Sequence, residues 1–406
     1  MNPYLNVSGL DAATCAGLLG YSPRLFQEWA AGQQLIPPSI ASHIASVLGV
    51  DANDLMAPPK QPVSVDEIEP AIWFKLRSEN LGPADKELVF LVRQLGTFYE
   101  ELERVRSQGG ASGWQLAFLQ VRQQINTQAP PREQGREAAQ VLRSRMGWNT
   151  GRTGIGEIIR GSLRNLGILI VESPIRASKI EGCAFHVGDS QRPCIFVNNH
   201  GTTWFRRNAV ILHELAHLIF DLPSEGASLD VYNHSPENEI SELRAEAFAQ
   251  EAAAPKEVLA HVAQKHGISW TAPFKVDDLA TLVADTHVEP RLIVRAAIES
   301  GLLASTQKDV LLGLQIWDRL KQLSEHALST KEYLEFVGQE ESEPWNLRRN
   351  TTIPSRTLRL PVTYVKNVLE ACEEGIISIS RAARLLMIDE HVFLERFKMD
   401  HLLGAE

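Results

Sequence analysis

The sequence predicts a multidomain, mainly α-helical protein with a small α+β domain in its central part. The chain has 406 residues, more than a single hydrophobic core usually serves, so we expect about two to four domains. Helix-start and helix-stop signals recur over residues 10–56 and again near the C-terminus. Two strand-like runs, 169–172 and 194–197, come shortly before an apolar helical run at 210–220.

Composition narrows the class of protein further. Hydrophobic residues make up 44% and charged residues 22% of the chain, as in ordinary globular proteins, and the net charge of −10 argues against coating nucleic acid along its whole length. No apolar run approaches the length of a membrane span, and residues 1–20 lack the features of a secretion signal. We therefore expect a cytoplasmic protein without a membrane partner.

The cysteines are few and are not spaced as a disulfide framework. They are expected to be reduced and mostly buried, as in other cytoplasmic proteins: Cys15, Cys183, Cys194 and Cys372. Cys183 and His186 have the spacing of half a zinc site. Because no second pair with matching spacing follows them, we interpret both as structural residues.

Residues 10–56 read as a series of short helices joined by tight turns. Ser22 and Pro23 form an N-cap followed by proline at the first helical position, and Gly32 ends that helix. Two short helices joined by a glycine-containing turn indicate a helix-turn-helix. Segments 10–16, 18–22, 26–32 and 44–50 resemble the Xre/Cro-type repressor domain. The sequence therefore predicts a helix-turn-helix module over residues 1–60.

This module carries little positive charge for a DNA-binding domain. Arg24 and Lys60 are the basic residues of 1–60, against four acidic ones, and the family's basic first helix has no counterpart. If the module reads bases, these positions of the recognition helix could reach them: Ser22, Arg24, Leu25, Gln27 and Glu28. A helical protein-interaction domain is the alternative interpretation.

The regions on either side of the centre carry weaker signals. Proline-rich residues 57–62 predict a stiff linker, and 61–130 reads as a helical linker region without a chemical motif. Residues 132–164 are rich in arginine, which we attribute to solvated helix faces. We assign 301–406 to a helical C-terminal region. Its acid-free basic stretch, 346–366, is either a phosphate-binding segment or a solvated linker, and 378–397 could form a second helix-turn-helix.

The most informative motif is H-E-x-x-H within the run 210–220, where every other residue is apolar. At helical spacing His213, Glu214 and His217 share a sector about 100° wide. Two imidazoles one turn apart can reach one Zn²⁺, and Glu214 lies beside the open position, where it can take a proton from water that attacks a carbonyl. The alternative is a pair of core histidines. Burial of three ionisable groups without a common partner would be costly, which favours the metal.

A catalytic zinc site needs a third protein ligand. The candidates are Glu237, Glu239, Glu242, Glu246 and, in a polar loop, His234. Glu242 and Glu246 lie one helical turn apart in the run 240–251, which suits one carboxylate on the metal and the other orienting a ligand histidine. A solvated, acidic helix start would explain the same composition.

Several of these features occur together in one known family. Arg206-Arg207, the motif at 212–219, Glu242 with Phe248-Ala249, and Pro255 resemble the ImmA/IrrE-type zinc metallopeptidases, over roughly 132–300. The resemblance implies a zincin-like metallopeptidase domain at 131–300, with Zn²⁺ held by His213, His217 and Glu242 and with Glu214 as the catalytic base. Glu246 replaces the family's usual asparagine and Asp221 a frequent histidine. Both are candidates for contacts behind the metal ligands.

The resemblance also implies a biological role. Family members with an Xre-type module are generally bacterial or phage regulators, often near toxin–antitoxin genes. We therefore expect a zinc-dependent endopeptidase that cleaves or controls a repressor or a partner protein, with Tyr232 or His234 as a candidate oxyanion donor. The alternative is a non-proteolytic DNA-binding regulator or antitoxin with a structural or sensory zinc site. Glu214 favours catalysis, because structural zinc sites are normally closed by a fourth protein ligand. The oligomeric state stays open.

Overall fold

The computed structural model describes twelve segments and isolated residues between 12 and 102: 21–37, 113–148, 155–173, 180–187, 192–200, 202–221, 236–271, 273–323, 346–349, 356–360, 362–388 and 390–397. This part is mainly helical and contains one small sheet, as the sequence predicted. None of the helices within these segments has the length and apolar character that crossing a membrane requires.

The sheet has the strand order β2-β3-β1-β5-β4. Its strands are β1 (Leu169–Ser173), β2 (Gly182–Val187), β3 (Arg192–Asn198), β4 (Asn346–Arg349) and β5 (Arg356–Arg359). β1 and β3 are parallel, whereas β2 is antiparallel to β3 and β5 is antiparallel to both β1 and β4. The stretch 346–366, expected as a linker or a phosphate-binding segment, thus contributes two strands to the sheet. Both are short and polar, so the alternation typical of a strand is absent from their sequence.

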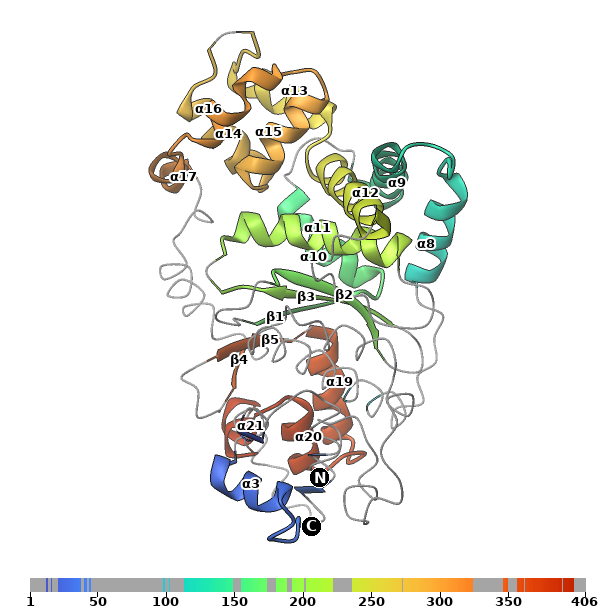
Figure 1. The fold of residues 1–406 in the computed structure, drawn as a ribbon, viewed down its shortest axis with the longest axis vertical. Coiled ribbons are helices and arrows are strands. Elements are labelled where there is room, and N and C mark those ends of the chain that lie inside the picture. Colours follow the sequence, from blue (N-terminus) through green and yellow to red (C-terminus); the bar gives the residue numbers. More distant parts are fainter. Residues whose placement is uncertain are drawn as a thin grey trace.

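Helices cover one face of the sheet (Figure 1). α11 (Trp204–Phe220) lies across β2 and β3, and α12 (Pro236–Ala253) packs on α11. α9 (Pro131–Met146) lies against α12, with α8 (Gly113–Gln124) beside it and α10 (Ile155–Asn165) next to β1. α9 and α12 approach closely at Gly135, where a Cβ would lie 2.2 Å from the carbonyl oxygen of Arg244.

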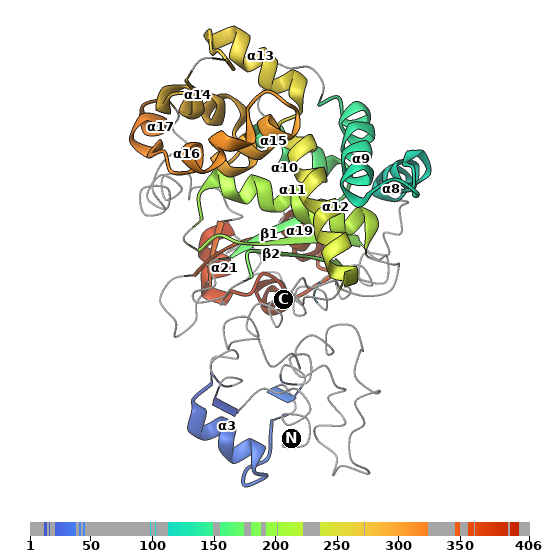
Figure 2. The same cartoon turned by 45° about the horizontal axis from the view of Figure 1, so that its top comes forward.

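A second group of helices lies beyond α11 on the side away from the sheet (Figures 1 and 2). It consists of α13 (Lys256–His266), α14 (Val276–Thr286), α15 (Pro290–Glu299), α16 (Lys308–Leu312) and α17 (Trp317–Leu323). α15 contacts α12 and so brings this group to the same region as α11. The apolar side chains of this group and of α8 to α12 form one continuous core.

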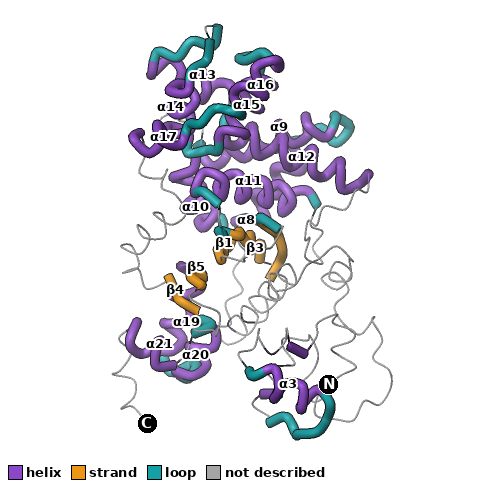
Figure 3. Tube along the Cα trace, turned by 60° about the vertical axis from the view of Figure 1, so that its left-hand side comes forward, coloured by secondary structure: helices purple, strands orange, loops and turns teal. Residues whose placement is uncertain are grey.

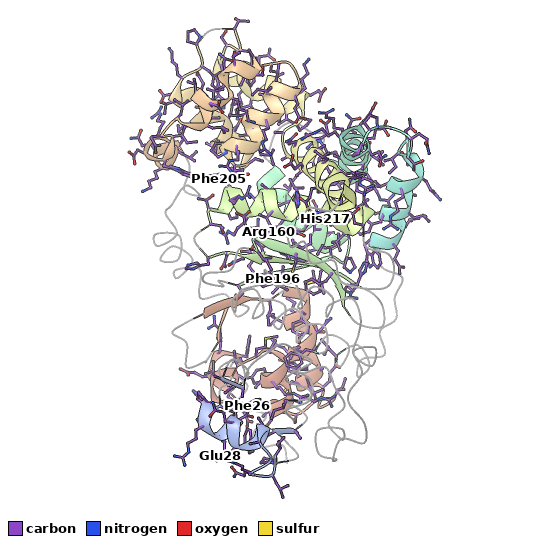
Figure 4. The ribbon with its side chains drawn as sticks, viewed as in Figure 1. Phe26, Glu28, Arg160, Phe196, Phe205 and His217 are labelled. Atoms are coloured by element: carbon purple, nitrogen blue, oxygen red, sulfur yellow. The ribbon has the colours of Figure 1, made fainter. Side chains whose placement is uncertain are left out.

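The opposite face of the sheet is covered by α19 (Val362–Glu373), α20 (Ile379–Leu385) and α21 (Glu390–Phe397), which Figure 3 shows below the orange strands. A second core joins the two layers, and Phe196 of β3 lies on this side (Figure 4). Met387, with a φ of 57°, forms the turn between α20 and α21. The segment 378–397 thus contains two short helices joined by a turn, and its buried side chains, Phe393 among them, share a core with the sheet.

β2 shows how the two cores divide the side chains of one strand. Cys183 and Phe185 point into the core beneath the sheet, and Ala184 points into the core above it. His186 stacks against Trp114 of α8, with ring centroids 5.7 Å apart. Cys183 and His186 therefore lie on opposite faces and cannot share a metal, which confirms their interpretation as structural residues. Three of the cysteines are described, and all three are buried.

A buried ion-pair cluster fixes α11 on the sheet. Glu172 of β1 is 5% exposed and accepts from Arg160 at 2.9 Å and from Arg207 of α11 at 2.6 Å. Arg143 is also buried and donates to main-chain carbonyls of residues 252 and 148. The interpretation of the arginines of 132–164 as parts of solvated helix faces is therefore wrong for Arg143 and Arg160. These two side chains connect elements inside the fold.

Helix α3 (Pro23–Ala30) matches the helix predicted between Ser22 and Gly32. The Ser22 hydroxyl accepts a hydrogen bond from the Leu25 N–H, and Pro23 occupies the first helical position. Phe26 and Trp29 are buried on its inner side. Figure 2 shows this helix well away from the layers around the sheet.

His186 should make the stability of the fold depend on pH. Its burial and the positive charge of Arg122 lower its pKa to about 4, whereas histidine in an unfolded chain titrates near ~6.5. Between these values the unfolded chain binds more protons, so the free energy of unfolding falls as the pH falls. We predict that His186→Phe, which keeps a ring against Trp114, removes this loss. Urea unfolding at about pH 7.5 and about pH 5 measures it.

The matched control is His261→Phe at an exposed position of α13, which should keep the wild-type dependence on pH. Equal losses of unfolding free energy in wild type and His186→Phe would contradict the prediction.

Candidate metal centre

The helix that carries the motif is enclosed on nearly all sides. Its N-cap is Thr203, whose hydroxyl accepts from the Arg206 N–H, and it ends where the Asp221 N–H donates to the His217 carbonyl. The sheet lies under α11 and α12 lies over it, which explains why residues 210–220 are apolar on all sides apart from the motif itself. The His213 side chain is 25% exposed, whereas Glu214 is 5% exposed and His217 1% exposed.

Three potential ligand atoms meet between α11 and α12. The Nε2 atoms of His213 and His217 are 3.1 Å apart. Glu242 places one carboxylate oxygen 3.2 Å from Nε2 of His213 and the other 3.6 Å from Nε2 of His217. Ligand atoms around a tetrahedral zinc with bonds near 2.0–2.1 Å stand about 3.3–3.4 Å from one another. The donor set and its spacing thus fit a shared metal ion.

Behind His217, whose position is labelled in Figure 4, a polar network fixes the orientation of its ring. Nδ1 lies 2.7 Å from Oδ2 of Asp221. Because a carboxylate only accepts, Nδ1 carries the proton, and the lone pair of Nε2 faces the other two ligands. Ser241 and Arg244 also donate to Asp221, each at 2.5 Å.

These partners keep Asp221 ionised although it is partly buried. Burial alone would raise the pKa of its carboxyl. The hydrogen bonds from His217 and Ser241 and the charge of Arg244 outweigh burial and hold the pKa below its ordinary value. Asp221 therefore acts on the candidate metal through His217, the arrangement usual for histidine ligands.

Next to the ligands lies a cavity of about 390 Å³. Its walls come from α11, α12, the start of β2 and α15, and they include His213, Glu214 and Glu242. At the end away from the ligands, Arg206 of α11 donates to both Glu181, just before β2, and Glu289, just before α15. Burial raises the pKa of Glu289 more than the Arg206 charge lowers it. The cavity is thus polar and is bordered by paired charges.

Glu246, the other carboxylate considered as a ligand, has different partners. It lies one turn beyond Glu242 on the same wall of the cavity. Its oxygens pair with Arg132 at 3.2 Å and with Arg295 at 3.4 Å. The structure thus brings Glu242, and not Glu246, to the two histidines.

The remaining candidate residues lie elsewhere. Tyr232 and His234 fall outside the described residues, as do the side chains of Glu237 and Glu239. On α3, Arg24 and Gln27 are exposed, and Arg24 pairs with Glu28 at 3.1 Å. Ser22 is exposed as well, but its hydroxyl caps the helix. These four side chains lie at the surface of one short helix, where Arg24, its one arginine, is paired with Glu28.

Several residues around the site had no signal in the sequence. Ser241 and Arg244 lie in the acidic run of α12 and are brought to Asp221 only by the packing of α12 on α11. Arg122 of α8 donates to the carbonyls of Leu218 and Ile219, at the C-terminal end of α11, where a cation is favourable. The start of β2 was not predicted as a strand, so Gly182 was missed.

Comparison with known proteins agrees with this geometry. Residues 163–280 match the family model of the IrrE N-terminal-like domain (Peptidase_M78). The matched segment holds β1 to β3, α11 and α12, and with them both motif histidines, Glu214 and Glu242. It supports the resemblance to the ImmA/IrrE family for this part of the chain and indicates a peptidase of a kind that is usually metal-dependent. No curated protein and no solved structure matches the chain.

The network behind His217 predicts the effect of a conservative substitution. Asp221→Asn keeps the side-chain size but removes the charge that holds the His217 ring and faces Arg244. We expect about tenfold or greater loss of metal affinity, measured by competition with a chromogenic chelator. Asp285→Asn, which removes a remote ion pair with Lys265, is the control. Equal affinities in wild type and Asp221→Asn would show that the network does not support metal binding.

Proposed function

We propose that this protein is a zinc-dependent endopeptidase of the ImmA/IrrE type, with His213, His217 and Glu242 as the metal ligands and Glu214 as the catalytic base. The observation that carries the proposal is the convergence of three ligand atoms at the spacing of a tetrahedral site beside the buried carboxylate of Glu214. The match of residues 163–280 to a peptidase family supports it independently.

The donor set favours zinc among the common metals. Two imidazoles and one carboxylate are typical ligands of catalytic zinc, whereas magnesium and calcium prefer oxygen ligands alone. Within the described residues the group contains three protein ligands, which leaves one tetrahedral position for water or substrate. When bound, the ion would polarise the substrate carbonyl and lower the pKa of a coordinated water.

The side chains of this chain supply the proton transfers. Glu214 accepts a proton from the attacking water and passes it to the leaving amine, which is general base and then general acid catalysis by one carboxylate. With an exposure of 5%, Glu214 is shielded from bulk solvent. Asp221 keeps the His217 ring in the tautomer that directs Nε2 toward the ligand group.

The edge of the sheet supports a peptide as the substrate. The Asn198 N–H donates to the Glu181 carbonyl at 2.7 Å, which sets the alternation of hydrogen bonds between β2 and β3. In an antiparallel pair every second residue bonds to the partner strand, so the N–H and C=O groups of Gly182 and Ala184 point away from β3. Among the described strands only β3 pairs with β2, and Gly182 lines the cavity. An extended peptide could add here as a further strand, which a small amide could not.

We further propose that the substrate is a protein with a regulatory role, such as a repressor or a partner protein encoded nearby. The N-terminal helix α3 supports this idea, since it offers an exposed face apart from the layers around the sheet. Its one arginine is paired with Glu28, so this face suits a protein partner at least as well as DNA. A regulator without proteolytic activity would leave the shielded carboxylate of Glu214 without a role.

Substitution of the base separates catalysis from metal binding. Glu214→Gln keeps the shape of the side chain but cannot accept the proton. We expect bound zinc at the wild-type ratio and a fall in hydrolysis of about 10²- to 10⁴-fold. Fluorescein-labelled casein and the product of the neighbouring gene are suitable probes, with zinc measured by mass spectrometry. If the variant cleaves at the wild-type rate, the proposed function is wrong.

The two glutamates of α12 give a second test. Glu242→Ala should lose stoichiometric zinc because it removes one of three ligands. Glu246→Ala should retain zinc, since Glu246 pairs with Arg132 and Arg295. The reverse result, with zinc lost in Glu246→Ala and kept in Glu242→Ala, would exclude the proposed ligand set.

A further inference from the structure

The first residue of β2 lies directly against the proposed catalytic base. A Cβ built on Gly182 would stand 3.0 Å from Oε1 and 3.1 Å from Cγ of Glu214. The same Cβ would stand 2.5 Å from Cγ1 of Val210, one turn earlier on α11. Carbon atoms in contact normally stand about 3.5–4.0 Å apart. Any other amino acid at position 182 would place a Cβ in the space next to the Glu214 side chain.

The strand is held in this place and cannot simply move back. On one side, the Asn198 side chain donates to the Ile180 carbonyl at 3.2 Å, and the Asn198 N–H donates to the Glu181 carbonyl. On the other side, the Glu181 carboxylate is paired with Arg206 of α11. Gly182 is thus tied both to β3 and to the helix that carries Glu214.

The neighbouring side chains also differ in their freedom to yield. Val210 is β-branched, 7% exposed and part of the core, so its rotamer is restricted. The carboxylate of Glu214 ends a longer side chain that borders the cavity. A Cβ at position 182 would therefore crowd Val210 most severely and would also press on Glu214, whose side chain has more freedom to shift than the strand or Val210.

We propose that Gly182 is a positioning residue for Glu214. By lacking a side chain, it lets the edge strand pass over the base while the carboxylate keeps its place in the cavity that His213 also lines. The inference rests on the proposed function, because it assumes that the direction of the Glu214 carboxylate matters for chemistry.

A purely structural role has a different consequence. If Gly182 only allows β2 to pack on α11, the contact that matters is the one with Val210, at 2.5 Å. Truncation of Val210 to alanine removes that atom and leaves the crowding against Glu214 unchanged. The double variant therefore distinguishes packing of the strand from positioning of the base, and it keeps the test valid if Gly182→Ala alone folds poorly.

The experiment uses the full chain loaded with Co²⁺, whose visible spectrum reports both metal binding and added ligands. The probe is acetohydroxamic acid, which chelates the metal as its anion after its hydroxyl proton has passed to a nearby base. The variants are Gly182→Ala, Val210→Ala, the double variant and Glu214→Gln. Gly161→Ala is the matched control, since a Cβ there meets nothing within 4 Å.

We expect wild-type Co²⁺ affinity in all variants. Acetohydroxamate should bind about tenfold more weakly, the size of one lost hydrogen bond to a charged group, in Gly182→Ala, in the double variant and in Glu214→Gln. Val210→Ala and Gly161→Ala should bind it as the wild type does. With labelled casein, the loss in Gly182→Ala should appear in kcat more than in KM.

Three results would overturn the inference: wild-type acetohydroxamate binding in Gly182→Ala, full recovery in the double variant, or loss of Co²⁺ binding in either. A failure of the proposed function looks different, since then the wild type would not bind Co²⁺, or Glu214→Gln would bind acetohydroxamate as tightly as the wild type.

Discussion

The site depends on how three ionisable side chains are accommodated in residues 210–220 of α11, a stretch that is otherwise apolar and enclosed. Between the sheet and α12, His217 and Glu214 are largely shielded from bulk water, so their polar atoms need partners inside the protein. The structure provides them on two sides of His217, with Asp221 at Nδ1 and Glu242 and His213 at Nε2. A cation bound by all three ligands would balance the negative charge of Glu242 and join the two helices.

The rest of the fold serves to hold α11 in place. Below it, the Glu172–Arg207 ion pair ties the helix to β1, and the helices α19 to α21 complete the other face of the sheet. Above it, α12 brings Ser241, Glu242 and Arg244 to the site from within about one turn. At its C-terminal end, Arg122 binds the last carbonyls. Metal chemistry in such a setting depends on packing, because small shifts of α12 would separate Glu242 from the histidines.

The sequence predicted the parts of this site that are local. His213, Glu214 and His217 lie on one helix, so their relation follows from the helical repeat alone. The candidates for the third ligand could be narrowed to a few residues, mainly glutamates. The choice of Glu242 over Glu246 depends on which face of α12 meets α11. Ser241, Arg244 and Gly182 could not be found in this way, because each acts through contact with a different element.

The same distinction holds for the fold. Strands β1 and β3 are continuous apolar runs and were predicted within one or two residues at each end. β2 begins with glycine and contains a histidine, while β4 and β5 are rich in arginine, so their sequences lack strand periodicity. Likewise, the apolar residues of α19 to α21 indicate helices, but nothing in them shows that they cover the sheet of a domain nearly two hundred residues earlier in the chain.

The central claim, that one metal ion joins α11 to α12, is tested most directly by X-ray diffraction from zinc-soaked crystals of the full chain, measured on both sides of the zinc absorption edge. We predict one strong anomalous peak about 2.0–2.2 Å from Nε2 of His213, Nε2 of His217 and a carboxylate oxygen of Glu242. A zinc peak at other residues, or none between the two histidines, would contradict it.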